Sequence, residues 1–373
     1  MSASEPRTVR FYDSTLRDGA QAPGVAFNRD QQLRIALALD ALGVDEIETG
    51  FAASGVEQRA DMRAIAGLGL RAGLLSLARP LKADVDHAVE AGVGGVILVA
   101  SVSDLHLAYK LRKDYAVVRA QALETVEYAR SLGLFVQLSM EDATRTPLDR
   151  LLDLAVEGQA HGAMRIGLAD TVGVATPAAM RKLVTGVREA VDLPISAHCH
   201  NDFGLAVANS LAAVEGGAQV LSTTQNGLGE RCGNASTEEC AAALELLHGV
   251  STNLDLALLT STSQLVAECS GVPIPPNKGV VGGNSFRHES GIHVAAMLQH
   301  PSCYEAYDPE IVGGRREYVL GKTSGRAALR HLAGSAGEQL DDDECRRLLD
   351  RVRLLNEAGT QVDPQTVRQL MER

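Results

Sequence analysis

Four side chains that suit a metal ion follow three segments of strand-like sequence. His198 and His200 lie two positions apart at the end of one segment, so their imidazoles project to the same side of a strand. Asp18 follows the first such segment and Asn234 follows the last. A carboxylate, two imidazoles and an amide oxygen form a mixed ligand set for a divalent ion such as zinc, manganese or magnesium. Because such a set leaves coordination positions open, it indicates a catalytic metal.

The residues around this histidine pair decide whether it indicates a metal site, since a lone His-x-His pair is more often two ordinary histidines. Here an Arg-Asp pair follows the first strand-like segment, and a glycine-rich loop follows the last. The spacing of that loop is not that of a dinucleotide fingerprint. Its Asn226, Gly227 and Gly229 are nevertheless predicted to bring backbone close to a cofactor. Cys199 alternates with the two histidines and is expected to point away from the metal.

A second histidine pair, His288 and His293, has a different spacing. With Glu289 it superficially resembles the helix of a zinc protease. The two histidines are five positions apart rather than four, so they would not share a helical face. We therefore exclude that type of metal site.

The elements that must position these residues repeat along the chain. Eight short segments rich in Val, Ile and Leu are each followed by a loop and a stretch with helical spacing, as in βα units. Eight units predict an α/β fold, a (β/α)8 TIM barrel, whose functional groups follow the carboxyl ends of the strands. Closure places the eighth strand beside the first, so the four metal ligands are expected to converge. The segments are Val9–Tyr12, Glu46–Glu48, Gly73–Leu77, Gly95–Ala100, Leu134–Ser139, Met164–Ala169, Leu193–His198 and Gln219–Thr223.

Local signals mark the ends of helices and of the barrel. Gly43 follows apolar residues at helical spacing and is expected to end a helix, whereas Thr176 and Pro177 are expected to start one. The strand rhythm fades after Leu247, and Pro273–Asn277 has the composition of a stiff linker. We expect a catalytic barrel over residues 1–275, and over 276–373 a linker with a small, mostly helical C-terminal domain that serves as lid and dimerisation unit.

Composition excludes several classes of function. The formal net charge is −12 and no run of Lys and Arg interrupts it, so nucleic acid is not an expected partner. The six cysteines are scattered without a CxxC pair, which favours a reducing cytoplasm. Met1–Arg10 lacks the apolar core of a signal peptide, and no stretch approaches the roughly 20 apolar residues of a membrane span. A cytoplasmic protein without a membrane partner is expected.

Together these motifs make the chain resemble the acyl-CoA-condensing metalloenzymes that include homocitrate, isopropylmalate and citramalate synthases. The resemblance covers nearly the whole chain, and the motif order and short C-terminal region are most similar to homocitrate synthases. The motifs that carry it are Asp13–Gln21, Glu141-Asp142, Asp170–Gly173, His198–Gly204, Asn226–Asn234, His288–His293 and Leu320–Lys322.

The resemblance implies a Claisen-type condensation of acetyl-CoA with a 2-oxo acid. Asp18, His198 and His200 would hold the divalent metal, with Asn234 as a weaker or second-shell member. The metal would chelate the carboxylate and carbonyl oxygens of the acid and polarise the carbonyl. Arg17 would stabilise the growing alkoxide.

The resemblance also implies an acid–base set split between the two domains. Glu141 and His293 match the family's acid–base pair, and Tyr304 matches its tyrosine partner. In the family the smaller domain reaches across to a neighbouring subunit, so a homodimer with composite sites is expected.

The substrate pocket departs from the family pattern. By resemblance Gln21, Glu48 and Thr171 contact the 2-oxo acid. Homocitrate synthases of the lysine pathway usually carry an arginine that grips the distal carboxylate of 2-oxoglutarate, where this chain has Gln137. Arg79 is a candidate replacement cation.

Several substrates and two other classes of function stay open. The leading acid is 2-oxoglutarate, giving homocitrate. Phosphonopyruvate, giving 2-phosphonomethylmalate, comes second, and 2-oxoisovalerate or pyruvate third. A barrel with the same metal site could instead cleave hydroxymethylglutaryl-CoA, although the His288–His293 segment and Tyr304 argue against a lyase. A non-enzymatic binding protein would have lost the metal or acid–base residues, and both sets are intact.

Overall fold

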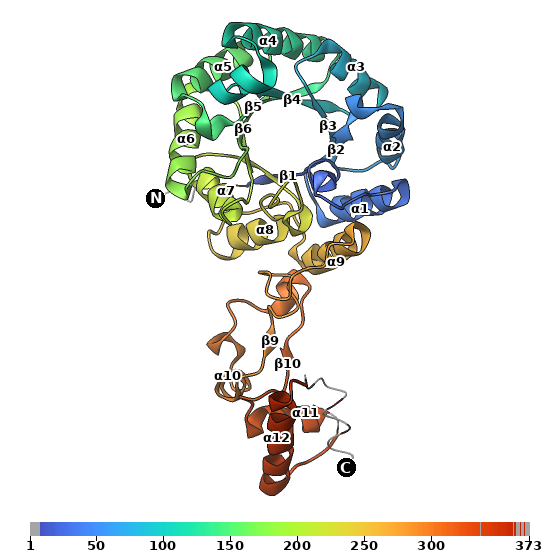
Figure 1. The fold of residues 1–373 in the computed structure, drawn as a ribbon, viewed down its shortest axis with the longest axis vertical. Helices are drawn as coiled ribbons and strands as arrows, with labels where there is room; N and C mark the ends of the chain where they lie inside the picture. Colours follow the sequence, from blue (N-terminus) through green and yellow to red (C-terminus); the bar gives the residue numbers. More distant parts are fainter. Residues whose placement is uncertain (1–7, 336, 361, 363–365, 367–368, 370–373) are drawn as a thin grey trace. The chain divides into compact units, whose positions relative to one another are not determined.

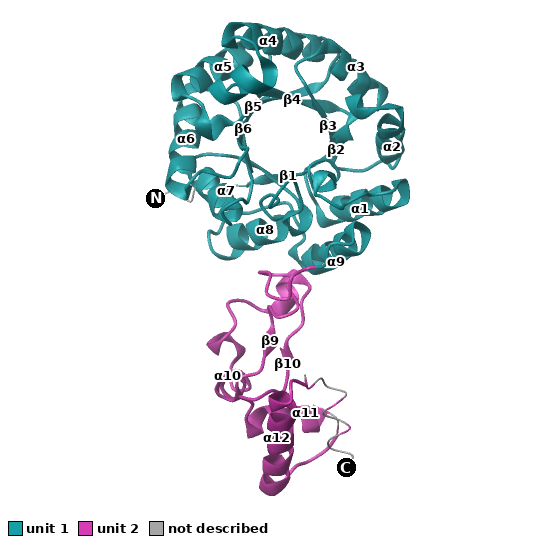
Figure 2. Ribbon diagram, in the orientation of Figure 1, with its two compact units in different colours: residues 1–273 teal, residues 274–373 magenta. Residues whose placement is uncertain are grey.

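The computed structural model describes residues 8–335, 337–360, 362, 366 and 369. Residues 1–7, which belong to the expectation for Met1–Arg10, lie outside the described residues. The chain divides into two compact units, residues 1–273 and 274–373 (Figure 2).

Eight parallel strands of the first unit close into a barrel (Figure 1). The eighth strand pairs with the first, with Asp13 opposite Thr223, which confirms the predicted closure. Both faces of the sheet are covered, and this explains why the strands are short apolar runs rather than alternating ones. The strands are β1 (Arg10–Asp13), β2 (Glu46–Phe51), β3 (Gly73–Ala78), β4 (Gly95–Ser101), β5 (Phe135–Glu141), β6 (Arg165–Asp170), β7 (Ile195–Cys199) and β8 (Val220–Thr223).

Helices surround the strands on the outside of the barrel (Figure 1). They are α1 (Arg29–Leu42), α2 (Val56–Ala66), α3 (Lys82–Glu90), α4 (Tyr115–Ser131), α5 (Leu148–Ala160), α6 (Pro177–Ala190), α7 (Ala206–Glu215), α8 (Thr237–Leu246) and α9 (Leu259–Ser270). Short helical turns lie in the loops: η1 (Gly19–Gln21), η2 (Ala52–Ser54), the π-helical η3 (His106–Leu111), η4 (Ala143–Arg145), η5 (Gln225–Gly227) and η6 (Leu256–Leu258).

The helix ends confirm the local sequence signals. Gly43 adopts the left-handed conformation at the end of α1, with φ of 95°. A Cβ atom there would also lie 2.4 Å from the carbonyl oxygen of Asn253, so only glycine fits. Thr176 caps α6 by accepting a hydrogen bond from the amide of Ala179, and Pro177 occupies the first turn.

The interior of the barrel combines apolar side chains with a buried ion pair between β2 and β6. Four side chains from different strands pack together there: Tyr12, Leu75, Ile97 and Val220. Arg165 of β6 has no exposed surface and donates two hydrogen bonds, of 3.0 and 2.6 Å, to the Glu46 carboxylate on β2. Its Nε also donates to the Gln137 amide oxygen on β5. The buried charge is therefore neutralised within the barrel.

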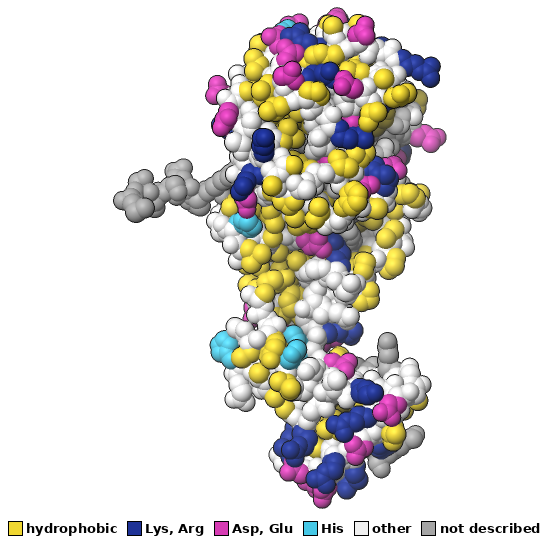
Figure 3. All heavy atoms as spheres, turned by 60° about the vertical axis from the view of Figure 1, so that its left-hand side comes forward, with side chains coloured by type: hydrophobic (Ala, Val, Ile, Leu, Met, Phe, Trp, Pro, Cys, Tyr) yellow, Lys and Arg dark blue, Asp and Glu magenta, His cyan; other side chains and the backbone are white. Residues whose placement is uncertain are grey.

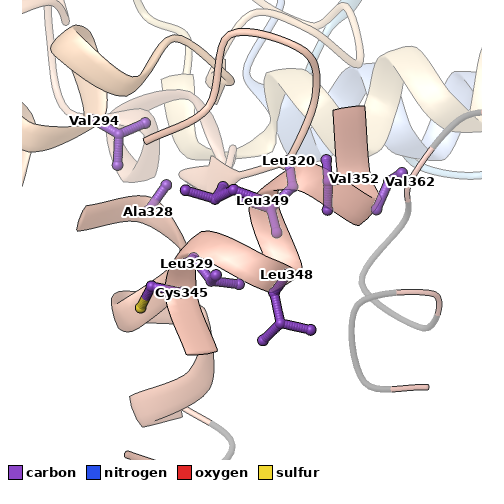
Figure 4. Close-up of a cluster of buried hydrophobic side chains, with 9 residues drawn as sticks. All are labelled: Val294, Leu320, Ala328, Leu329, Cys345, Leu348, Leu349, Val352 and Val362. Atoms are coloured by element: carbon purple, nitrogen blue, oxygen red, sulfur yellow. The ribbon is translucent and has the colours of Figure 1, made fainter. Parts of the chain in front are cut away.

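The second unit has its own small core (Figure 4). A two-stranded parallel sheet pairs β9 (Arg287–His288) with β10 (Glu317–Tyr318). The helices are α10 (Gly291–Met297), η7 (Pro301–Cys303), η8 (Pro309–Val312), α11 (Arg326–Ser335) and α12 (Asp342–Glu357). Asp341 and Glu344 form a capping box that starts α12. The core consists of Val294, Leu320, Ala328, Leu329, Cys345, Leu348, Leu349, Val352 and Val362.

Within the described residues, no helix combines the length and the hydropathy needed to cross a membrane. On the face shown in Figure 3, cationic and anionic side chains lie interspersed with apolar ones. The charges of this face are therefore not sorted into a broad basic tract.

Candidate active site

Asp18, His198 and His200 meet at the carboxyl ends of β1 and β7. Their nearest ligand atoms all lie within 4.8 Å of one another. Asp18 Oδ2 is 3.6 Å from His198 Nε2 and 3.9 Å from His200 Nε2, and the two Nε2 atoms are 3.1 Å apart. Two ring nitrogens that face each other can share at most one proton, whereas a cation between them would satisfy both lone pairs. The three side chains therefore fit a divalent ion.

Burial keeps both imidazoles in the neutral form that binds a metal. It lowers the pKa of His198 to about 3, with a further contribution from His200, and it also lowers the pKa of His200. His198 Nδ1 lies 2.8 Å from the Ser222 hydroxyl on β8. That contact fixes the ring and leaves Nε2 available as a ligand atom.

Asp18 is the anionic partner of the histidines. Burial alone would raise the pKa of Asp18, but the Arg17 guanidinium and the two histidines outweigh it, so the pKa is lowered. Arg17 NH1 lies 2.8 Å from Asp18 and its Nε 2.8 Å from Glu48, a fully buried carboxylate on β2. Burial would lower the pKa of Arg17, yet these two carboxylates raise it. Arg17 is thus a fixed cation beside the metal site.

The loop after β8 is folded against the metal site. Asn234 forms an isolated antiparallel bridge with His200, and its amide hydrogen-bonds to Asp18. Its Oδ1 is buried and has no hydrogen-bond partner among the described residues. At Gly229, where φ is 159°, a Cβ atom would lie 2.1 Å from Asn234 Nδ2 and 2.9 Å from Asp18 Oδ1. Glycine is required here because the backbone passes so close to the site.

A cavity of about 130 Å³ opens beside the metal site. Its walls come from six strands and from residues that follow β1, β6 and β7: Tyr12, Arg17, Asp18, Leu77, Ile97, Val99, Gln137, Ser139, Glu141, Gly167, Leu168, Ala169, Thr171, Ser196, His198 and His200. The sequence-predicted Thr171 and Glu141 thus lie in the same cavity as the metal triad. Gly167 makes room on β6, since a Cβ there would lie 2.2 Å from Ser139 Oγ and 2.7 Å from Gln137 Nε2.

Glu141, at the end of β5, is held by three side chains from the β4 side. Its Oε2 contacts the Ser101 hydroxyl, lies 2.5 Å from Lys110 Nζ and lies 3.5 Å from His106 Nδ1. Burial would raise the pKa of Glu141, but the Lys110 ammonium and the other two groups lower it. None of the three partners is singled out by sequence patterns. The available signal was their place in the loop after the fourth strand, where a barrel carries functional groups.

Other sequence-predicted site residues lie outside the cavity wall. Gln21 is exposed in η1, and Arg79 pairs with Asp84 at 2.8 and 2.9 Å. Their roles as substrate ligands stay predictions. Asn226 has a φ of 61°, and its side-chain amide donates a hydrogen bond to the Ser263 carbonyl. The Gly227 carbonyl accepts a hydrogen bond from the backbone N–H of Asn234. Cys199 is fully buried and hydrogen-bonds to Ser210 of α7, so it points away from the metal as expected.

In the second unit, His293 and Tyr304 lie together. Their rings stack with centroids 3.9 Å apart and an interplanar angle of 23°. His293 is exposed and the Tyr304 side chain is 45% exposed, so both are accessible within this unit.

Known proteins resemble this chain over nearly its whole length. A family model described as HMGL-like matches residues 8–266, and one described as homocitrate synthase post-HMGL domain-like matches residues 280–360. Homocitrate synthase AksA of Methanopyrus kandleri is 48% identical over 96% of this chain and 90% of its own length. (R)-citramalate synthase CimA of Methanocaldococcus jannaschii is 45% identical over 94% of this chain and 72% of its own length. A probable 2-isopropylmalate synthase of Ignicoccus hospitalis is also 45% identical, over 99% of this chain and 92% of its own length.

Solved structures match the barrel. The hydroxymethylglutaryl-CoA lyase of Bacillus subtilis superposes with a TM-score of 0.66 at 22% identity, covering 72% of this chain and 96% of that one. The corresponding lyase of Pseudomonas aeruginosa superposes with a TM-score of 0.64 at 26% identity, covering 72% of this chain and 95% of that one. The chain therefore belongs to the HMGL-like family, and within it to the homocitrate synthase and isopropylmalate synthase family of acetyl-CoA-condensing enzymes.

Proposed function

We propose that this protein condenses acetyl-CoA with a 2-oxo acid at the Asp18–His198–His200 centre, and that 2-oxoglutarate, giving homocitrate, is its leading substrate. The observation that carries the reaction class is the shared cavity of this triad, Arg17 and Glu141. The similarity to homocitrate synthase AksA supports the choice of acid.

The proposed reaction gives a task to four side chains. When bound, a divalent ion would polarise the 2-oxo carbonyl. Glu141 takes a proton from the acetyl methyl group, and the resulting enolate carbon attacks the 2-oxo carbon. Arg17 stabilises the alkoxide that forms on the former carbonyl oxygen. His293 and Tyr304 assist the proton transfers, and water then hydrolyses the thioester and releases CoA.

A second set of substrates is favoured by the charge of the cavity. Among its described lining residues, Arg17 is the sole cation, since both histidines are held neutral, and it is already paired with Asp18 and Glu48. Gln137 is hydrogen-bonded to Arg165 and Ser139, so its amide is fixed. A 2-oxo acid with an uncharged tail, such as pyruvate or 2-oxoisovalerate, would need no further cation. The citramalate and isopropylmalate synthases among the relatives agree with this alternative.

The discriminating experiment is CoA thiol release by the purified protein against a panel of 2-oxo acids, with and without a chelator. We expect metal-dependent release that is fastest with 2-oxoglutarate. A faster reaction with pyruvate, 2-oxoisovalerate or phosphonopyruvate would keep the reaction class and replace the acid. Absence of release with every acid, together with acetyl-CoA formation from hydroxymethylglutaryl-CoA, would replace the condensation by cleavage.

A further inference from the structure

The Glu141 carboxylate is placed by residues of β4 and of the π-helical turn η3. In the barrel register Ser101, the last residue of β4, lies directly opposite Glu141. Lys110 Nζ bridges the two, at 3.1 Å from Ser101 Oγ and 2.5 Å from Glu141 Oε2. The same carboxylate oxygen therefore accepts from a hydroxyl and from an ammonium group.

The backbone of η3 explains how Lys110 reaches this position. Leu107 is buried and anchors the turn, and its amide bonds to the carbonyl of Ser103. The turn closes on Arg112, which has a left-handed φ of 53°. A non-glycine residue in this conformation is strained, and π-turns are rare and are enriched at functional sites. The backbone thus departs from regular helix at the turn that carries Lys110.

The adjacent carboxylate is neutralised separately. Asp142, which follows Glu141, is paired with Arg145 of η4 at 2.8 Å. His106 stands between the two carboxylates, 3.5 Å from Glu141 and 3.9 Å from Asp142. The charged and titratable groups that face Glu141 are therefore His106 and Lys110 from η3, with Asp142 and Arg145 next to them. Lys110 is the sole cation within 3 Å of Glu141 in the described part of the chain.

We propose that Lys110 is a positioning residue that keeps Glu141 ionised and aims its carboxylate into the cavity. This inference rests on the proposed role of Glu141 in removing a proton from acetyl-CoA. The Lys110 side chain is 49% exposed, so its ammonium stays in contact with solvent, whereas the Glu141 side chain is only 19% exposed. A half-buried carboxylate without this cation would bind a proton more readily and would have fewer groups to orient it.

The experiment compares three variants of the full-length, metal-loaded protein. Lys110→Met keeps the length of the stem and removes the charge, and Lys110→Arg keeps the charge. Lys113→Met is the matched control, since Lys113 lies three residues later and bonds to Gln121 on α4. For each, kcat and KM for both substrates are measured from pH 3 to 8, with circular dichroism to verify folding at each pH.

We expect Lys110→Met to lower kcat by about 10- to 100-fold, as the loss of an oriented base does. Its KM values should stay within about twofold, and the acid limb of its kcat profile should move toward higher pH. Lys110→Arg should recover most of kcat, and Lys113→Met should match the unchanged protein.

Two results would overturn the proposal. One is a Lys110→Met enzyme with unchanged kcat and pH profile. The other is an equal loss in Lys110→Met and Lys110→Arg without movement of the acid limb, which is what a purely structural role predicts. Failure of the proposed function looks different, because the unchanged protein would then release no CoA with any 2-oxo acid.

Discussion

Asp18 is the one carboxylate of the metal triad, and its loss should remove the metal. Asp18→Asn keeps the shape of the side chain but takes away the negative charge that faces both histidines. We expect metal content, measured by plasma emission after gel filtration, to fall from about one equivalent to near zero, with loss of turnover of at least about 100-fold. Asp153→Asn, an exposed aspartate of α5 paired with Arg119, should retain both. Full metal content in Asp18→Asn would exclude this triad as the site.

His198 should make the metal-free protein sensitive to acid. Burial lowers its pKa in the folded protein to about 3, below the ordinary value of 6.5, so the unfolded chain takes up a proton at a higher pH than the folded one. The contribution of His198 to stability is complete above pH 6.5 and is lost as the pH falls toward 3. His198→Asn should therefore reduce the loss of unfolding free energy between pH 6.5 and 5 by about 1–2 kcal/mol.

Urea denaturation of chelator-treated protein at pH 6.5 and 5, followed by circular dichroism, measures this difference. His161→Asn, at the end of α5, serves as the control and should keep the pH dependence of the unchanged protein. An identical pH dependence in His198→Asn would show that the imidazole is not held neutral.

At the scale of residues, the sequence predicted the groups whose position follows from strand periodicity. The spacing of His198 and His200 placed both on the inner face, and Cys199 on the outer one. His106 and Lys110 could not be predicted in the same way, because a π-turn has no recognisable period in the sequence. Ser101 lies one residue beyond the predicted strand segment Gly95–Ala100. The role of Arg79 as a substrate ligand stays a prediction, and its guanidinium is paired with Asp84 in this structure.

At the scale of elements, the ion pair of Arg165 on β6 with Glu46 on β2 should stabilise the barrel. Arg165→Met leaves the Glu46 carboxylate, whose side chain is 13% exposed, without its cation. We expect the free energy of unfolding to fall by about 3–5 kcal/mol, measured by urea denaturation. Adding Glu46→Gln should restore part of this loss, because the unpaired charge is then gone.

The control for this ion pair is Arg181→Met on α6. Arg181 is exposed and lies 3.8 Å from Glu215, so its removal should cost less than about 1 kcal/mol. Equal losses for the buried and the exposed arginine would contradict a structural role of the β2–β6 pair.

Elements with strong periodicity were predictable, and very short ones were not. All eight barrel strands were expected within one to three residues of their observed bounds, because each is a buried apolar run between turn residues. β9 and β10 have two residues each and depend on partners 30 positions apart, so the sequence carried no signal for them. Their pairing is a tertiary effect.

At the scale of the whole molecule, the residues proposed for acid–base catalysis are divided between two compact units. If one subunit supplies Glu141 and its partner supplies His293, two inactive variants should complement each other. A mixture of Glu141→Gln and His293→Ala subunits, unfolded and refolded together, should recover up to about a quarter of full activity, since half of the dimers would hold one intact site of two.

Each variant refolded alone is the control and should stay inactive. Recovery that requires mixing would establish composite sites in a dimer. No recovery from a mixture that light scattering shows to be dimeric would place both residues of each site on the same chain.

The strands that supply the walls of the cavity bear on how members of this family come to differ. The metal triad stands on β1 and β7, whereas Gln137, Ser139 and Gly167 line the cavity from β5 and β6. The proposed metal ligands and these three wall residues therefore lie on different arcs of one cylinder, although Glu141 ends β5. Relatives named for three different products are 45–48% identical to this chain. Replacements of Gln137, Ser139 or Gly167 would reshape the cavity of such a relative without removing a metal ligand.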